Sequence, residues 1–403
     1  MDVHARVKEI AGERMQGALL YWNAPLLYHK GGKFTVAELE TRVVTITLTQ
    51  QCNLACSYCY EHHKTQSAMD FSTAKSIIDQ ELLNTPDGES LEFDLFGGEP
   101  FLEFELIKAI TEYICQNKGE KNCRVFATTN GTLVHGEIQE WLIQHKQCFI
   151  CGLSLDGTRE MHNLNRSNSY DMIDLSFFKE QYPNQEIKMT ISPETLPHLA
   201  EDVIDVHKQG FLVACNLAYE INWSNPQNAT ILERELHTLI DFYLANPEIE
   251  PCSILEMGRY NVGYEKDQAV RFCGAGVYMR SYDVDGKSYP CQFFMPLSLG
   301  NDKAATAHKI KFPEDVIPLE LLDEKCRECI IKSVCPNCFG ANYAATGSIY
   351  SRDDNMCRLT KIIVRARSYF KARQWQLGQL HENENDQQAL LRAIVAIQEG
   401  LNV

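Results

Sequence analysis

The chain has 403 residues, of which 44% are hydrophobic and 23% are charged, the composition of a globular protein with a sizeable core. Its formal net charge of −16 at pH 7 argues against broad binding to nucleic acids or to anionic membranes. The first residues carry both signs of charge and no apolar run. No stretch approaches the roughly 18 apolar residues of a membrane span, so the sequence predicts a soluble, cytoplasmic protein.

Residues 43–216 alternate between β-branched runs and helical patterns. The strands are predicted at 43–49, 91–96, 124–129, 149–155, 187–192 and 211–217. Ser72 is expected to cap the first helix between them, whose apolar face is predicted to hold Ala74, Ile77, Ile78 and Leu82. Further helices are predicted from apolar residues at 107, 110 and 114 and at 199, 203 and 206, and near 136–145 and 231–245.

Strands joined by helices form parallel β/α units, so the predicted class is α/β, either a partial (β/α)6 barrel or an open doubly wound sheet. In both, the reactive site lies at the carboxyl ends of the strands. From Cys273 the character changes to clustered cysteines, with a hairpin expected at Asp285-Gly286. A helix is predicted after Cys357, followed by an acidic linker and a final short helix.

The predicted organisation therefore has four segments. The first 42 residues are expected to hold a helix and a short hairpin, since they are too few for a full domain. The barrel is predicted at 43–250, a cysteine-rich domain at 251–360 and C-terminal helices at 361–403.

The chain contains 16 cysteines, many for a predicted cytoplasmic protein. Disulfide scaffolds belong to small secreted domains, whereas clustered thiols in a reducing compartment favour metal ligation or catalysis. Cys52, Cys56 and Cys59 follow the first predicted strand with the spacing C-x3-C-x2-C. Three thiolates on one loop can hold three irons of a four-iron cluster and leave the fourth iron open to a small molecule. The alternatives are unrelated thiols or a zinc half-site, although zinc favours C-x2-C pairs.

The loop CNLACSYCY at 52–60 resembles the signature of the radical S-adenosylmethionine (SAM) superfamily, including an aromatic residue, Tyr58, before the third cysteine. The resemblance implies that the open iron of a [4Fe-4S] cluster chelates SAM. It also implies that an electron from the cluster cleaves SAM to a 5′-deoxyadenosyl radical.

The run Gly97-Gly98-Glu99-Pro100 follows the second predicted strand. Glycines allow a close backbone approach to a ligand, and the carboxylate can receive an ammonium group. The resemblance assigns this motif to the amino group of the methionine moiety. By itself, the motif is equally a turn that leads into a helix.

Two further strand ends carry candidate SAM contacts. The Ser154 hydroxyl suits a ribose and the Arg166 guanidinium suits a carboxylate, and the resemblance carries both roles over. A surface salt bridge is the alternative for Arg166. Asn130 also ends a strand, where a turn-forming Asn-Gly is an equally good interpretation.

The later cysteines resemble the SPASM extension of the same superfamily, which houses two auxiliary [4Fe-4S] clusters and would bring the total to three. Their spacing is C-x12-G-x4-C, then C-x2-C-x5-C-x2-C, then a lone cysteine, although the extension more commonly ends with C-x3-C where CPNC stands here. The resemblance gives the outer cluster Cys326, Cys329, Cys335 and Cys357, and the inner cluster Cys273, Cys291 and Cys338. The inner cluster either keeps an open iron for a substrate thiolate or takes a fourth ligand such as Cys252.

The remaining cysteines are expected to be structural. They are Cys115, Cys123, Cys148, Cys151 and Cys215. A buried free cysteine behaves as a small hydrophobe. Cys148 and Cys151 lie in a predicted strand, where their odd separation points them to opposite faces and argues against a shared metal.

The resemblance implies a maturase that modifies a ribosomally made precursor peptide, most simply by a cysteine thioether crosslink. Its implied partners are that peptide and an electron donor such as flavodoxin or ferredoxin, with no nucleic acid or membrane. For leader recognition a separate leader-recognition protein, the N-terminal hairpin and the core surface stay open. Carbon–carbon crosslinking, epimerisation and another oxidation stay open. Formylglycine formation, the sulfatase-maturase reaction, uses an aspartate after the second SPASM cysteine, where this chain has Gln292, which cannot accept a proton.

Two other classes of protein share some of these features. A pure electron-transfer protein needs the clusters but not the 97–100 motif, Ser154 or Arg166. A zinc-binding interaction module uses C-x2-C pairs without the first loop. The sequence assigns no catalytic side chain.

Overall fold

The computed structural model describes residues 41–86, 88–257, 262, 269–380 and 384–402. The chain divides into two compact units: unit 1 is Met1–Leu39, Asn222–Phe272 and Pro313–Val403, and unit 2 is Glu40–Ile221 and Cys273–Phe312. The helix and hairpin expected near the N-terminus fall on residues 1–40, outside the described residues. The four predicted domain segments stay predictions.

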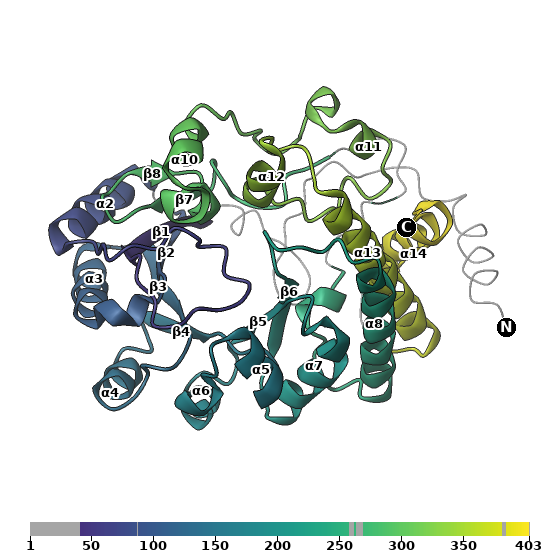
Figure 1. The fold of residues 1–403 in the computed structure, drawn as a ribbon, viewed down its shortest axis with the longest axis horizontal. Helices are drawn as coiled ribbons and strands as arrows, with labels where there is room; N and C mark the ends of the chain where they lie inside the picture. The colour runs from purple at the N-terminus through teal and green to yellow at the C-terminus, as the bar shows by residue number, and fades with distance from the viewer. Residues whose placement is uncertain (1–40, 87, 258–261, 263–268, 381–383, 403) are drawn as a thin grey trace. The chain divides into compact units, whose positions relative to one another are not determined.

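Unit 2 is built on strands that mostly run parallel. They are β1 (Thr41–Thr49), β2 (Ser90–Gly97), β3 (Asn122–Thr129), β4 (Phe149–Leu153), β5 (Ile187–Ile191), β6 (Val213–Leu217), β7 (Met279–Tyr282) and β8 (Ser288–Tyr289). One sheet has the order β4-β3-β2-β1-β7-β8 and a second pairs β5 with β6. Only β7 and β8, the predicted hairpin, pair antiparallel among the described strands. A bridge from Ser154 to Lys188 connects the end of β4 to β5, so the strands β1 to β6 form the arc seen in Figure 1.

Helices cover the outer side of this arc (Figure 1). The helices of unit 2 are α2 (Phe71–Asn84), η2 (Pro100–Glu103), α3 (Phe104–Asn117), α4 (Glu137–Gln144), α5 (Arg159–Asn165), η3 (Tyr170–Met172), α6 (Leu175–Gln181), η4 (Leu196–His198), α7 (Leu199–Lys208), η6 (Gln292–Phe294), α9 (Pro296–Leu299) and α10 (Asn301–Ala307). The mixed α/β class and the partial barrel are confirmed. The predicted cap of α2 is wrong: the Asp70 carboxylate accepts the Thr73 N–H at 2.9 Å, which leaves Ser72 inside the first turn.

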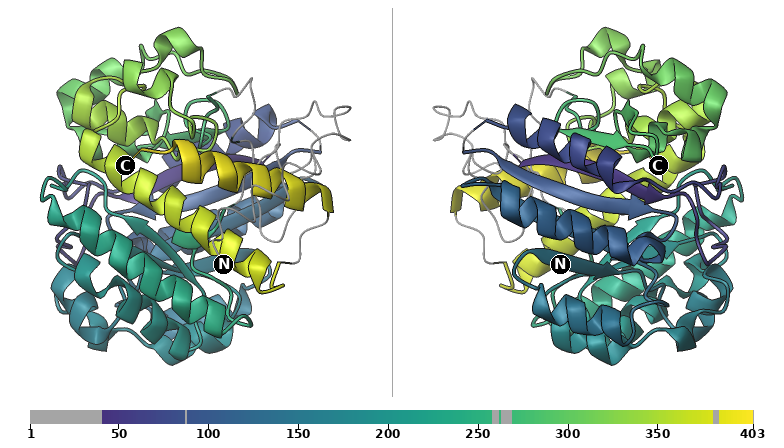
Figure 2. Two further views of the ribbon diagram at one scale, coloured as in Figure 1. Left: turned by 90° about the vertical axis from the view of Figure 1, so that its right-hand side faces the viewer. Right: turned by 90° about the vertical axis from the view of Figure 1, so that its left-hand side faces the viewer.

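The core of unit 2 lies between strands and helices. In β2, Leu91, Phe93 and Leu95 are buried while the residues between them are half-buried, as the twofold repeat of a strand requires. The buried faces of α2 and α3 include the predicted isoleucines, among them Ile77 and Ile110. In the right-hand view of Figure 2 these two helices lie over the strands. The opposite face carries the buried Thr45 and Thr47 of β1 beside half-buried residues of β2.

Unit 1 is mainly helical. Its helices are α8 (Gln227–Ala245), η5 (Ser253–Leu255), η7 (Leu319–Leu321), α11 (Glu324–Arg327), α12 (Phe339–Thr346), α13 (Asp354–Gln376) and α14 (Glu384–Gly400). The long helix α13 packs against α8, which the left-hand view of Figure 2 shows, and against α14. Asp353 caps α13, so Cys357 lies in the first turn of this helix. The prediction that the helix begins only after Cys357 is wrong.

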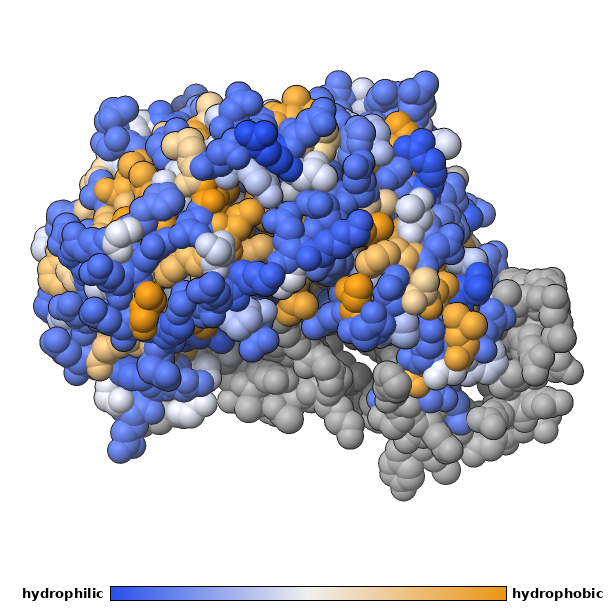
Figure 3. Space-filling model, turned by 90° about the horizontal axis from the view of Figure 1, so that it is seen from below, coloured by the Kyte–Doolittle hydropathy of each residue, from blue (hydrophilic) through white to orange (hydrophobic). Residues whose placement is uncertain are grey.

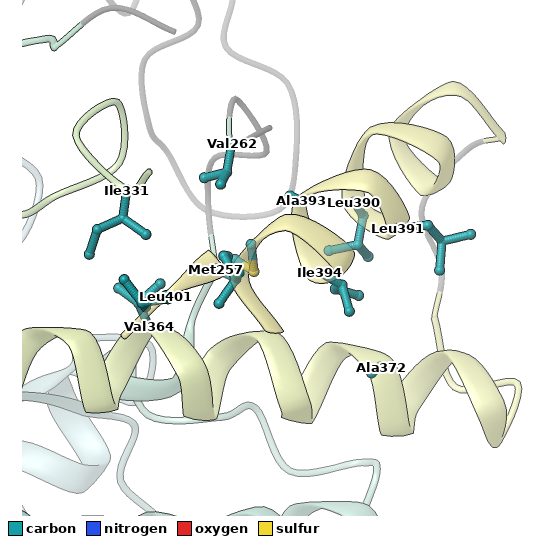
Figure 4. Packing of buried hydrophobic residues seen from close by; sticks show 11 residues of the cluster. Met257, Val262, Ile331, Val364, Ala372, Leu390, Leu391, Ala393, Ile394 and Leu401 are labelled. Carbon is teal, nitrogen blue, oxygen red and sulfur yellow. The ribbon is translucent and has the colours of Figure 1, made fainter. Parts of the chain in front are cut away.

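A hydrophobic cluster joins α13 and α14 in unit 1 (Figure 4). Its buried members are Met257, Val262, Ile331, Val364, Ala372, Leu390, Leu391, Ala393, Ile394, Ile397 and Leu401. Because α14 supplies many of these residues, the predicted C-terminal helix is an integral part of the unit 1 core and not an appendage.

The surface face in Figure 3 is mainly hydrophilic, and its hydrophobic residues form separate small patches over the described part of the chain. Every described helix is too short or too polar to cross a lipid bilayer.

Candidate active site

Three cysteine thiols lie on the loop that follows β1. Cys52, Cys56 and Cys59 are all half-buried, and each lies close enough to its neighbour to affect it electrostatically. Burial raises the pKa of the Cys52 thiol to about 11 and also raises that of Cys56, so an incoming metal must displace protons. The Lys64 Nζ donates to the Cys59 sulfur at 2.8 Å. Three thiols from one short loop fit a four-iron cluster that keeps one open iron.

Hydrogen bonds hold this cluster loop to the turn after α5. The backbone N–H of Ser57 donates to the Asn165 carbonyl at 2.9 Å, and that of Ala55 donates to the Ser167 hydroxyl at the same distance. Ser167 has a left-handed backbone, with φ of 57°, which is unusual outside glycine. The loop is therefore braced from a segment more than 100 residues later in the chain.

Gly97 and Gly98 bring the end of β2 against the start of the cluster loop. The Gly98 N–H donates to the Thr49 carbonyl at 3.1 Å. A Cβ on Gly98 would lie 2.2 Å from the Gln51 oxygen and 2.9 Å from the Cys52 Cβ. Glycine was predicted here for close approach to a ligand. The structure shows a close approach to the chain itself, which positions Cys52.

The Glu99 carboxylate is buried and accepts local hydrogen bonds. Its oxygens accept from the Thr129 hydroxyl and the Asn130 N–H, both at 2.8 Å, and from the Phe101 N–H at 3.1 Å. Burial outweighs these bonds and raises the pKa of Glu99 to about 7. The Asn130 side chain donates in turn to Asn53 on the cluster loop at 2.8 Å, so Asn130 links two predicted SAM motifs. The contact of Glu99 with an ammonium group stays a prediction.

A second network joins the cluster loop to the end of β4. The Asp156 carboxylate accepts from the Tyr58 hydroxyl at 2.6 Å and from the Thr190 N–H at 2.9 Å. The Arg166 Nε lies 2.9 Å from the same carboxylate, and both side chains are at least nine-tenths buried. The surface salt bridge considered for Arg166 is therefore wrong, since the pair is internal. The Ser154 hydroxyl makes no hydrogen bond to a described residue.

Sequence reasoning missed two carboxylates of this region. Asp156 lies two residues after Ser154, but only the fold shows that it pairs with Tyr58 and Arg166. Asp202, on α7, accepts the Thr158 N–H and hydroxyl at 2.9 and 2.8 Å and packs against Gly157, so it fixes the loop after β4. No local motif marks Asp202.

The four cysteines predicted for the outer cluster line one pocket in unit 1. They are Cys326, Cys329, Cys335 and Cys357. Burial raises the pKa of Cys326 to about 11, and the Arg352 Nη1 donates to the Cys335 sulfur at 3.2 Å. Four thiols around one partly apolar pocket suit a cluster with all four irons ligated by the chain. Their ligation stays a proposal.

The three cysteines predicted to ligate the inner cluster are divided between the two units. Cys273 and Cys291 belong to unit 2, where Cys291 is buried, while Cys338 caps α12 in unit 1. Cys252, the alternative fourth ligand, belongs to unit 1 and is fully buried. This ligand set therefore stays a prediction.

The cysteines expected to be structural are buried or half-buried. Cys151 lies in β4 and is fully buried, whereas Cys148 precedes the strand, in contrast to the prediction that both lie in it. The thiol of Cys148 faces that of Cys115. Cys115 and Cys148 belong neither to the cysteines of the cluster loop nor to the four pocket cysteines of unit 1.

The model of the radical SAM superfamily matches residues 46–175, which include the cluster loop, Glu99, Asn130, Ser154 and Arg166. These residues form a radical SAM domain. The matched span runs from β1 to the start of α6, so the family pattern covers the part of unit 2 that holds the thiols and both hydrogen-bond networks.

Relatives of this chain differ in how much of its length they match. An uncharacterised Methanocaldococcus jannaschii protein is 40% identical over 113 residues, which are 28% of this chain and 37% of that protein. The cysteine-type anaerobic sulfatase-maturating enzyme of Clostridium perfringens is 25% identical over 71% of this chain and 86% of its own. The antilisterial bacteriocin subtilosin biosynthesis protein AlbA of Bacillus subtilis is 24% identical over 64% of this chain and 56% of its own.

Among solved structures, native anSMEcpe with bound AdoMet and Cp18Cys peptide matches with a TM-score of 0.63. It is 19% identical and covers 82% of this chain and 98% of that chain. The likeness shows that the chain shares that fold.

Proposed function

We propose that the enzyme installs an intramolecular crosslink, a cysteine thioether, in a ribosomally made precursor peptide. The support is the set of relatives: one matures sulfatases and another acts in bacteriocin biosynthesis. Both names describe work on a gene-encoded chain. The partners proposed are the precursor peptide, an electron donor such as flavodoxin or ferredoxin, and a separate leader-recognition protein.

The residue after Cys291 distinguishes the two candidate reactions. Gln292 begins η6, is half-buried, and has a side-chain oxygen without a hydrogen-bond partner among the described residues. An amide cannot take a proton at neutral pH, so this position cannot serve as the base that the sulfatase maturases use there. Formylglycine formation is the second candidate, because the sulfatase-maturating relative aligns over most of its length.

The proposed cofactors are SAM and three [4Fe-4S] clusters. Cys52, Cys56 and Cys59 would hold the first, the four pocket cysteines of unit 1 the outer auxiliary cluster, and Cys273, Cys291 and Cys338 the inner one. A four-iron cluster with an open iron supplies one-electron reduction of SAM, the source of the 5′-deoxyadenosyl radical. Tyr58, Arg166 and Asp156 keep the cluster loop and the end of β4 in place, and Ser154 presents a hydroxyl for the ribose.

Co-expression with the small peptides encoded beside the enzyme tests the reaction. For a thioether we expect a peptide that has lost two hydrogens and whose cysteine no longer reacts with an alkylating agent, measured by tandem mass spectrometry. Loss of the cysteine sulfur would identify formylglycine instead. A peptide modified with its cysteine still reactive would overturn the thioether. The reconstituted enzyme should carry about twelve irons per chain.

A further inference from the structure

Glu220 has an unusual backbone for its residue type. It lies three residues after β6, at the carboxyl edge of the strands, with φ of 60°. The other described non-glycine residues with positive φ are Ser167 and Asn168, and Ser167 accepts a hydrogen bond from the cluster loop. Left-handed backbone is costly for a residue with a Cβ, and such strain persists where the surrounding structure imposes it, often at functional sites.

Contacts place Glu220 beside the cluster loop within unit 2. Its Oε2 lies 3.5 Å from the His62 Nε2, three residues after Cys59. The preceding Tyr219 packs edge-on against Phe293, with ring centroids 5.8 Å apart, and Phe293 stacks on Tyr60 at 4.2 Å. Tyr219 and Phe293 are the chain neighbours of Glu220 and Gln292, so this ring contact brings the segment of Glu220 to the segment that lacks a base.

The Glu220 side chain is only 12% exposed, and its Oε1 has no hydrogen-bond partner among the described residues. Burial raises the pKa of this carboxyl to about 7, and the Lys303 ammonium on α10 opposes that shift. His62 also faces the carboxylate, and burial together with His63 and Lys64 lowers the pKa of His62, which keeps it neutral at pH 7. A carboxylate that titrates near neutral pH is matched to removing a proton at that pH.

We propose that the Glu220 carboxylate is the proton acceptor for the substrate thiol. The proposal rests on the peptide-modifying function proposed above. In this step the S–H bond breaks, its electron pair stays on sulfur to give a thiolate, and an O–H bond forms on Glu220. The step needs no oxidant. Glu220 then releases the proton to water beside His62, whose side chain is 49% exposed.

The test compares Glu220→Gln with Glu220→Asp and with a control, Glu194→Gln, an exposed carboxylate after β5. The reconstituted holoenzyme is assayed with the precursor peptide from co-expression, from pH 6 to pH 9. We expect Glu220→Gln to lower the crosslinking rate roughly 100-fold and to remove a step in the pH–rate profile near pH 7. Glu220→Asp should recover part of the rate. Formation of 5′-deoxyadenosine should persist in all variants, since it does not use this proton.

A Glu220→Gln enzyme that keeps the wild-type rate and pH profile would overturn the proposal. If the wild-type enzyme crosslinks no peptide, the proposed function fails, and pH-difference infrared spectra of the holoenzyme judge Glu220 separately. A carboxyl band that titrates near pH 7 and disappears in Glu220→Gln supports the proton acceptor. A band that titrates at the ordinary pH of a glutamate overturns it.

Discussion

At the scale of single residues, buried charge pairs fix the candidate active site. Arg166 and Asp156 lie at 9% and 1% side-chain exposure, and their 2.9 Å contact leaves neither charge alone. The guanidinium also lies over the Tyr58 ring, 5.4 Å from its centroid. Because desolvated charges are costly when unpaired, the position of each of these side chains depends on the others.

Asp156→Asn tests this dependence. The substitution leaves the Arg166 charge buried without its partner, and we expect the free energy of unfolding to fall by about 3–5 kcal/mol in urea denaturation. The control is Asp171→Asn, which breaks an Arg–Asp pair on the surface, with Arg159 and Asp171 at 65% and 62% exposure. The free energy of unfolding of the control should fall much less, because water solvates exposed charges. Equal losses in both variants would contradict the internal role.

At the scale of elements, the end of each parallel strand delivers one part of the site to a common edge. β1 leads into the cluster loop, β2 into Gly97-Gly98-Glu99, β3 into Asn130 and β4 into Ser154 and Asp156. Hydrogen bonds between successive strand ends, such as that from Asn130 to Glu99, align these loops. The geometry of the site therefore depends on the register between β1, β2 and β3.

Gly98→Ala tests the contact between two of these strand ends. An added Cβ would meet the Gln51 carbonyl and the Cys52 Cβ, neither of which can move without shifting the cluster loop. We expect the purified variant to lose the iron held by that loop, about four per chain, and to form no 5′-deoxyadenosine. In Gly119→Ala the new methyl group meets no atom within 4 Å, so this control should keep its iron. Full iron content in Gly98→Ala would refute the packing argument.

At the scale of the molecule, several carboxyl groups of unit 2 share one electrostatic property. Burial raises the pKa of Glu99, Asp202 and Glu220 to about 7 and that of Asp94 to about 6. The unfolded chain releases these protons near pH 4, whereas the folded chain keeps them until the pH is nearly neutral. The folded state therefore binds more protons in this window, and stability falls as the pH rises through it.

Asp202→Asn should flatten that pH dependence. The amide oxygen can still accept from Thr158, but position 202 no longer carries an ionisable group. We expect the wild type to lose up to about 1.4 kcal/mol per pH unit more than the variant between pH 5 and pH 7, measured by urea denaturation. Glu201→Gln, an exposed change on the same helix, should follow the wild type. The same dependence of the free energy of unfolding on pH in wild type and Asp202→Asn would contradict this account.

The strand and helix order could be read from the sequence because it depends on local patterns. The twofold repeat in β2 and the apolar spacing of α2 and α3 are visible in short windows and survive in the structure. The cap of α2 shows where such reading fails: Ser72 was predicted, and only the structure shows that Asp70, two residues earlier, accepts the capping hydrogen bond.

The sequence by itself indicated the radical SAM domain, because the cysteine loop, the glycines and the strand-end polar residues are local motifs with characteristic spacing. The tertiary structure alone decided what surrounds them. It brought Asp156 to Arg166, Asp202 to Gly157 and Glu220 to His62, pairs separated by 10 to about 160 residues along the chain. No local pattern encodes such pairs, since they arise only when parallel strands bring distant loops to one edge of the sheet.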